Sequence, residues 1–111
     1  DENDGDSTDN AASLLTDNPR INDSAPPKSS GGKYYSQTQG GVNFNQKGNA
    51  EFDTSDFGDS NVGNLRLDYC LPSENLDVKS SGVFWPKPGE IGANLIDATD
   101  HRLVWIDLLI D

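Results

Sequence analysis

The sequence predicts an α+β fold in which a loop-rich first part, residues 1–63, precedes a strand-rich second part, residues 64–111. Large apolar residues are sparse up to Gly63 and come in runs after it. Alternation of apolar and polar side chains within these runs is typical of β-strands. The last run has apolar side chains on both faces, which predicts a strand buried on both sides in the middle of a layered fold.

Charge and length limit the classes of function. The chain has 111 residues, with 8 Lys and Arg against 19 Asp and Glu, so its formal net charge is −11. Because phosphate binding depends on clustered Lys and Arg, this charge argues against a broad nucleic-acid clamp. The longest apolar stretch, Leu103 to Ile110, is interrupted by Asp107 and is far shorter than the ~20 residues that cross a bilayer. One cysteine, Cys70, excludes an internal disulfide.

The hydrophobic content is low for a self-sufficient core of this length. Hydrophobic residues make up 32% of the chain, and the mean hydropathy is −0.70. The length allows one small domain or part of a larger one. We therefore expect part of a domain, or a chain that another element supports.

In the first part we expect one short helix and long loops. Ser7 or Asp9 can cap a helix over residues 11–15 that ends at Asn18-Pro19. Residues 23–41 are rich in Ser, Pro, Gly and Gln, which predicts a long loop. Residues 40–63 place isolated aromatic side chains among turn formers, which favours an ordered loop or short elements.

Three strands are expected in the second part. Apolar residues alternate with polar ones from Leu65 to Leu71, before Pro72-Ser73 ends the strand. A second strand is expected over residues 76–85, with a break near residues 80–82. The third is expected from Leu103 to Leu109.

Two polar side chains stand out beside these strands. His101 is the only His, and it lies among acidic residues just before the third strand. Active-site residues are often exposed at the end of a rigid strand, but a surface His in a solvated turn is the alternative. Asp68 lies inside an apolar strand, where a buried carboxylate needs a partner. That partner can be Arg66, a structural role, or the imidazole of His101, which Asp68 would then orient.

Three stretches resemble the C-terminal part of the endonuclease/exonuclease/phosphatase family, the fold of deoxyribonuclease-like and abasic-site nucleases. Residues 64–73 are similar to the family's Arg-hydrophobic-Asp-Tyr strand. Residues 99–105 are similar to its closing Ser-Asp-His motif, with Thr99 in place of Ser, and residues 81–86 resemble a bacterial subgroup. The resemblance implies that residues 1–111 form the C-terminal segment of a four-layer α/β sandwich with mainly antiparallel strands and long loops. The N-terminal part of that domain, with the family's other metal ligands, would precede residue 1.

The same resemblance implies a metal-dependent phosphoesterase, a nuclease or a phosphatase that hydrolyses phosphodiester or phosphomonoester bonds. His101 would contact the scissile phosphate as general base or stabilise the charged transition state, and Asp68 would orient His101. Asp100 would help to position a divalent ion, usually Mg²⁺ and alternatively Mn²⁺ or Ca²⁺. The substrate would be a nucleic acid or a small phosphate ester, and the expected location is extracellular or periplasmic. This segment alone is expected to be inactive and poorly folded.

Two alternatives stay open. One is a non-catalytic, secreted β-rich module that binds calcium or a partner through acidic side chains. The other is a degenerate family member that keeps the fold as a scaffold. A hydrogen bond between Asp68 and His101 would favour the hydrolase over the binding module, whereas side chains that point apart would favour the module.

Overall fold

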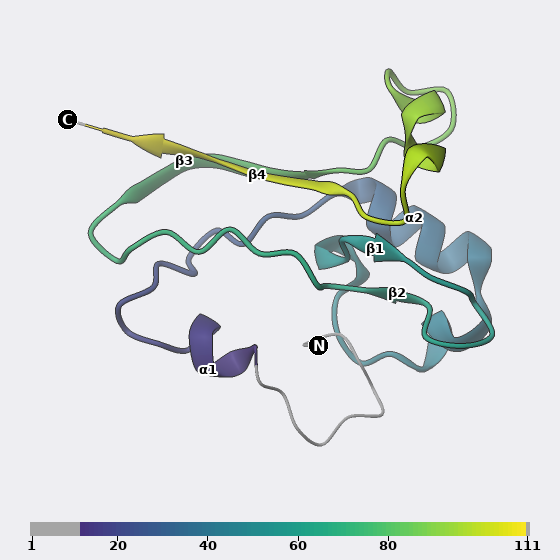
Figure 1. The fold of residues 1–111 in the computed structure, drawn as a ribbon, viewed down its shortest axis with the longest axis horizontal. Coiled ribbons are helices and arrows are strands. Elements are labelled where there is room, and N and C mark those ends of the chain that lie inside the picture. The colour runs from purple at the N-terminus through teal and green to yellow at the C-terminus, as the bar shows by residue number, and fades with distance from the viewer. Residues whose placement is uncertain (1–11, 111) are drawn as a thin grey trace.

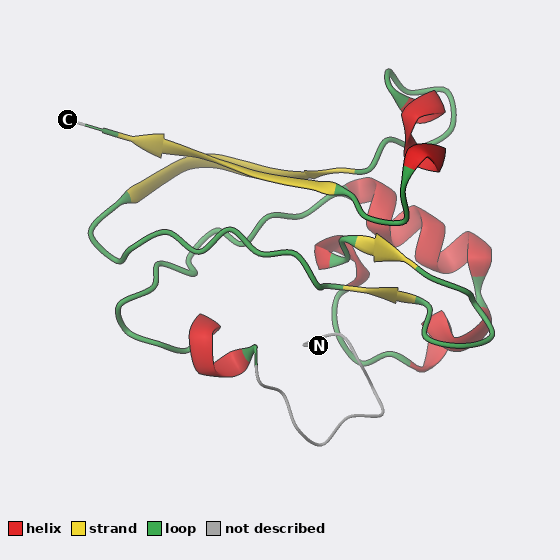
Figure 2. Ribbon diagram, in the orientation of Figure 1, coloured by secondary structure: helices red, strands yellow, loops and turns green. Residues whose placement is uncertain are grey.

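The computed structural model describes residues 12–110, in which helices accompany two separate two-stranded antiparallel sheets (Figure 1). The elements in chain order are α1 (Ser13–Thr16), α2 (Ser30–Gln39), η1 (Gly41–Asn45), η2 (Ala50–Phe52), β1 (Ser55–Asp56), β2 (Asn64–Leu65), β3 (Asp77–Phe84), η3 (Ala93–Ala98) and β4 (Leu103–Leu109). Short helices and long connections dominate the part before β3 (Figure 2). The α+β class predicted from the sequence is confirmed.

The first predicted helix exists, although it is short. It spans Ser13–Thr16, and its N-cap, Ala12, makes no side-chain capping bond. The proposed caps Ser7 and Asp9 lie outside the described residues. The helix ends before Asn18, whose side-chain oxygen accepts a hydrogen bond from the backbone N–H of Arg20 at 2.9 Å. This local turn replaces further helical bonding, as expected for an Asn before a Pro.

The long loop predicted over residues 23–41 is wrong, because α2 occupies its second half. Ser29 caps this helix: its hydroxyl accepts a hydrogen bond from the backbone N–H of Gly32 at 2.9 Å. A Cβ added to Gly31 would collide with the carbonyl oxygen of Trp85. Tyr35 stacks on the Trp85 ring with a centroid distance of 5.7 Å. The small residues of the helix therefore let it pack closely against Trp85 and η2, a form of stabilisation that apolar periodicity does not reveal.

The first predicted strand, Leu65 to Leu71, is also wrong beyond Leu65, since only Asn64–Leu65 is a strand. The hydroxyl oxygen of Thr54 accepts hydrogen bonds from the backbone N–H groups of Leu67 and Asp68, each at 3.0 Å. A side chain thus takes the bonds that a neighbouring strand would otherwise make. Residues 40–63 contain short elements, namely η1, η2 and β1, as one of the two sequence interpretations expected.

β1 lies between two other segments and organises the centre of the chain. On one side it pairs antiparallel with β2, with Ser55 opposite Leu65. On the other side Ser55 forms a bridge with His101. The backbone N–H of Arg102 donates to the carbonyl oxygen of Thr54 at 2.7 Å. The chain before β4 is therefore fixed beside β1 by backbone hydrogen bonds.

β3 and β4 form a long antiparallel ribbon that extends away from this centre (Figure 1). The bounds of β4 are those predicted from the sequence. β3 continues through the expected break, with a register irregularity between Val78 and Ser80. Burial of β4 on both sides is wrong for the described residues, because alternate side chains of the strand are exposed and Leu103 is 68% exposed. Trp105 on the same face is 42% exposed.

The buried interior is small and largely polar. Among the described residues, the buried hydrophobic side chains are Leu65, Val83 and Trp85. The largest fully buried side chains are polar ones around β1 and β2: Asn64, Thr54, Asp53 and Ser55. Within residues 12–110, no helix has the length and apolar character needed to cross a membrane. The centre of the fold is therefore specified by hydrogen bonds as much as by apolar packing.

Candidate active site

His101 and Asp68, which are 33 positions apart in the sequence, meet beside β1. The Nδ1 atom of His101 lies 2.8 Å from Oδ2 of Asp68. The His101 side chain is 46% exposed and that of Asp68 is 38% exposed, so the pair is open to solvent. An Asp that accepts the Nδ1–H bond fixes the imidazole tautomer. The other ring nitrogen, Nε2, is then the atom that can meet a ligand or a proton.

An aromatic ring borders this pair. Phe57, which directly follows β1, lies edge-on to the His101 ring, with centroids 6.0 Å apart and an interplanar angle of 82°. Phe57 is half-buried, so it is held by the fold while part of its ring remains accessible. Its contact restricts rotation of the imidazole.

A third side chain, that of Thr54, supports the pair, and the sequence analysis did not identify it. The hydroxyl of Thr54 donates to Oδ2 of Asp68 at 2.9 Å, so this one oxygen receives both Thr54 and His101. Thr54 is only 1% exposed. It lies in the segment of turn-forming residues before β1, where no motif or periodicity marks it.

Arg66, the structural alternative for Asp68, is used differently. Its guanidinium lies over the rings of Tyr69 and Phe52, at 4.4 and 5.6 Å from their centroids. Arg66 is 4% exposed, so these rings shield its charge from water. The Arg-x-Asp-Tyr pattern thus supplies two functions in neighbouring positions: Arg66 packs inward, and Asp68 reaches the imidazole.

Arg102 fixes the segment that carries His101. Its Nη1 atom donates to three backbone carbonyl oxygens of the preceding segment: Ile96 at 3.1 Å, Thr99 at 2.7 Å and His101 at 3.1 Å. Its Nη2 atom lies 3.4 Å from Oδ2 of Asp56. The guanidinium also stacks over the Trp85 ring at 4.8 Å. One buried side chain therefore determines the path of residues 96–101.

Buried amides extend this support to α2. Both carboxylate oxygens of Asp56 accept hydrogen bonds from Nε2 of Gln39, at 3.1 and 3.0 Å. Oε1 of Gln39 accepts from Nδ2 of Asn64 at 2.8 Å, and the backbone N–H of Asn64 donates to Oδ1 of Asn43 at 2.7 Å. The polar network links α2 and both strands of the central sheet to Arg102.

Asp100, the predicted metal-binding residue, is held through its backbone, while its side chain is exposed. Its carbonyl oxygen accepts from the N–H of Asp56 at 2.8 Å. Thr99 bonds nearby backbone, because its hydroxyl oxygen accepts from the N–H of His101 at 3.2 Å. Within residues 12–110, no group of three or more His, Cys, Asp or Glu side chains is arranged to hold a metal ion. Asp100 therefore offers one exposed carboxylate and not a complete ligand set.

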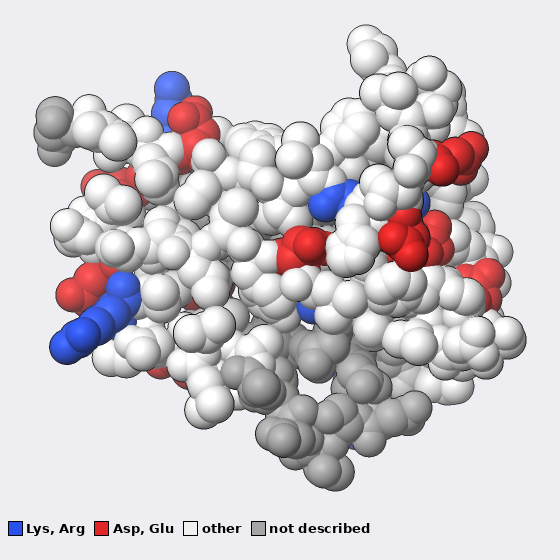
Figure 3. Space-filling view, in the orientation of Figure 1, with Lys and Arg blue, Asp and Glu red and all other residues white. Residues whose placement is uncertain are grey.

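Acidic side chains are spread over the molecular surface. On the face seen in Figure 3, acidic side chains lie at both ends and in the middle, and no broad basic patch is visible.

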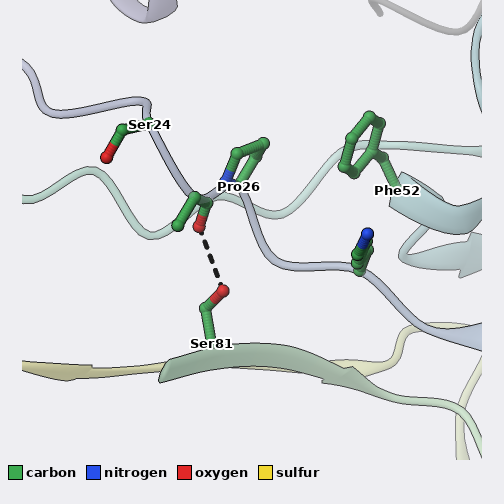
Figure 4. A pocket seen from close by; sticks show the side chains of 6 residues that line it. Ser24, Pro26, Phe52 and Ser81 are labelled. Atoms are coloured by element: carbon green, nitrogen blue, oxygen red, sulfur yellow. Dashed lines mark hydrogen bonds between the residues drawn. The ribbon is translucent and has the colours of Figure 1, made fainter. Parts of the chain in front are cut away.

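A separate pocket lies between β3 and residues 24–28, where the hydroxyl of Ser81 donates to the carbonyl oxygen of Ala25 (Figure 4). This pocket includes none of the predicted site residues.

Comparison of the chain with family models, with curated proteins and with solved structures found no match. The chemical interpretation of the site therefore depends on its geometry and on the motif residues.

Proposed function

We propose that this chain belongs to a metal-dependent phosphoesterase, a nuclease or phosphatase, in which His101 and Asp68 act as a catalytic pair. The observation that supports this most directly is the 2.8 Å contact between Nδ1 of His101 and Oδ2 of Asp68. The pair is half-exposed, unlike a core histidine. A histidine in an ordinary solvated turn has no need of a distant carboxylate held in place by a buried hydroxyl. The same contact favours the hydrolase over the non-catalytic binding module.

The proposed chemistry uses Nε2 of His101. With Nδ1–H donating to Asp68, Nε2 is available to take a proton from water or to donate one to a phosphoryl oxygen. Asp68 holds the required tautomer and stabilises positive charge on the ring. A positioned acid or base of this kind contributes about 10²- to 10⁴-fold in rate.

Asp100 is the residue that we propose as a ligand of the divalent ion, with Mg²⁺ as the first candidate and Mn²⁺ or Ca²⁺ as alternatives. Its exposed carboxylate is a hard oxygen donor of the type that these ions prefer. Such an ion would polarise a phosphoryl oxygen and would offset repulsion between an anionic substrate and the carboxylates of Asp68 and Asp100. The remaining ligands would come from outside the described residues.

We further propose that residues 1–111 are the C-terminal segment of a four-layer sandwich domain. The exposed face of the β3–β4 ribbon supports this: Phe84, Leu103, Trp105 and Leu109 are 38%, 68%, 42% and 55% exposed. Phe84 pairs with Leu103 across the two strands, so these apolar side chains lie on one face. Asp107 lies on the same face, but exposed apolar side chains predominate there, and such a face normally packs against another layer. The N-terminal part of the same domain is the layer that we propose.

The experiment is phosphodiester hydrolysis by the full-length protein, measured with a chromogenic diester in Mg²⁺. His101→Ala is expected to lower kcat by about 10³-fold and Asp68→Asn by about 10²-fold or more, because each removes part of the proton-transfer pair. Asp77→Asn, an exposed Asp at the start of β3, is the matched control and should keep full activity. Turnover that is unchanged in His101→Ala would overturn the assignment.

A further inference from the structure

Thr54 occupies the point where the two halves of the site are joined. Its backbone N–H donates to the carbonyl oxygen of Leu65 at 2.8 Å, on the segment that leads to Asp68. Its carbonyl oxygen accepts from the N–H of Arg102 at 2.7 Å, next to His101. The main chain of Thr54 thus fixes both catalytic segments relative to each other.

The hydrogen-bonding capacity of the Thr54 hydroxyl is completely used. A hydroxyl has one proton to donate and two lone pairs that accept. The backbone N–H groups of Leu67 and Asp68 donate to it, each at 3.0 Å, and therefore take both lone pairs. Its single proton is left for Oδ2 of Asp68 at 2.9 Å. The direction of this donation is consequently determined by the surrounding backbone.

This donation restricts a torsion that is otherwise soft. The terminal torsion of an Asp side chain has a broad profile, and the Asp68 side chain is 38% exposed, so water competes for its oxygens. The Thr54 hydroxyl and Nδ1 of His101 meet the same oxygen of Asp68. Together they hold the carboxylate in the orientation that the imidazole requires.

We propose that Thr54 is a positioning residue, which sets the Asp68 carboxylate and through it the tautomer and orientation of His101. Thr54 is 1% exposed, so it acts through Asp68 and not by contact with substrate. Its kinetic consequence depends on the proposed function, whereas its effect on the imidazole does not. A supporting residue of this kind typically contributes about 10- to 100-fold to activity.

The test compares Thr54→Val with Thr54→Ser in the full-length protein. Val keeps the shape but removes the hydroxyl, and should lower kcat by about 10- to 100-fold with KM nearly unchanged. Ser keeps the hydroxyl and should restore kcat to within about threefold of wild type. Thr38→Val, at an exposed threonine of α2 whose hydroxyl donates to the carbonyl of Tyr34, is the matched control.

A second readout is the ¹⁵N chemical shift of the two ring nitrogens of His101, which reports the tautomer without any substrate. His101 is the only His in these residues, and its signal is assigned by its loss in His101→Ala. Wild type and Thr54→Ser should show a proton on Nδ1, whereas Thr54→Val should show a mixture of tautomers. Unaltered ring shifts and kcat in Thr54→Val would overturn the proposal for Thr54.

Thr54→Val leaves two backbone N–H groups without an acceptor and can therefore prevent folding. In that case Thr54→Ala replaces it, because the smaller side chain leaves room for a water to bond those groups. Equal tautomers and equal kcat in Thr54→Ala and Thr54→Ser would again refute the role of the hydroxyl. If His101→Ala keeps full turnover while the tautomer still depends on Thr54, the proposed function fails and the positioning role stands.

Discussion

Replacement of Arg102 by Met should destabilise this chain far more than replacement of an exposed charged residue. Arg102 is 7% exposed, and its guanidinium bonds three carbonyl groups between Ile96 and His101. It also lies 3.4 Å from the carboxylate of Asp56. Met has a similar length and apolar stem, so the variant removes the charge and its donors while it keeps most of the packing against Trp85.

The magnitude follows from what the variant leaves behind. Removal of one partner of a buried ion pair costs about 3–5 kcal/mol, since the other charge remains without compensation. The side chain of Asp56 is 23% exposed and also accepts two bonds from Gln39, which reduces that penalty. The three carbonyl groups also lose their charged donor. A hydrogen bond to a charged group is ordinarily worth about 1.5–3 kcal/mol. The contributions of these three bonds are not additive, because they share one guanidinium. We expect a loss of about 3–4 kcal/mol in the free energy of unfolding.

The assay is urea unfolding of the full-length protein, followed by circular dichroism and tryptophan fluorescence. Arg20→Met, at an exposed arginine, is the matched control and should change the free energy of unfolding by less than about 0.5 kcal/mol. A double-mutant cycle with Asp56→Asn should give a coupling energy of about 1–2 kcal/mol between the two side chains. A loss below about 1 kcal/mol for Arg102→Met would refute the assigned role of the guanidinium.

Two further changes test the packing of α2. Gly31→Ala should destabilise the protein by about 2–3 kcal/mol in urea unfolding, since the new Cβ would meet the carbonyl oxygen of Trp85. Gly58→Ala is the control and should be nearly neutral, because its Cβ would meet only a side-chain nitrogen at 3.3 Å. Equal losses of stability in both variants would contradict this packing. Burial, with a smaller contribution from Tyr34, raises the pKa of Tyr35 above its ordinary value of 10.0. The folded chain then binds the phenol proton more tightly than the unfolded chain. The contribution of Tyr35 to the free energy of unfolding is therefore complete below about pH 10 and is lost as pH rises through the pKa of the folded state. Tyr35→Phe should flatten the alkaline fall of the unfolding free energy, and an identical fall in both proteins would contradict the shift.

Local sequence patterns predicted the elements that are determined by residues close together in the sequence. The alternation of residues 103–109 gave the correct bounds of β4, and Asn18-Pro19 marked the end of α1. The pattern failed at Leu65 to Leu71, because the hydroxyl of Thr54 takes the N–H groups that a strand partner would bond. It also failed at α2, since glycines weaken the apparent helical propensity and the helix packs on η2 and on Trp85, which is distant in sequence.

The candidate site shows the same division. An isolated acid inside an apolar run and a single His among acids were visible in the sequence, and the structure brings Asp68 and His101 to 2.8 Å. The residues that hold Asp68 and His101 in place could not be identified from the sequence. Thr54 and Asp56 lie in a stretch of turn formers, and their importance comes from backbone bonds to segments far along the chain.

The sequence by itself therefore determined the α+β class, the position of β4 and the choice of Asp68 and His101 as candidate site residues, because each depends on composition or on neighbours within a few positions. Only the tertiary structure decided which partner Asp68 uses, since the sequence allowed both Arg66 and His101 as partners. It chose His101 because β1 lies between the two segments: its backbone bonds fix both stretches of chain, and the buried hydroxyl of Thr54 turns the carboxylate toward the imidazole.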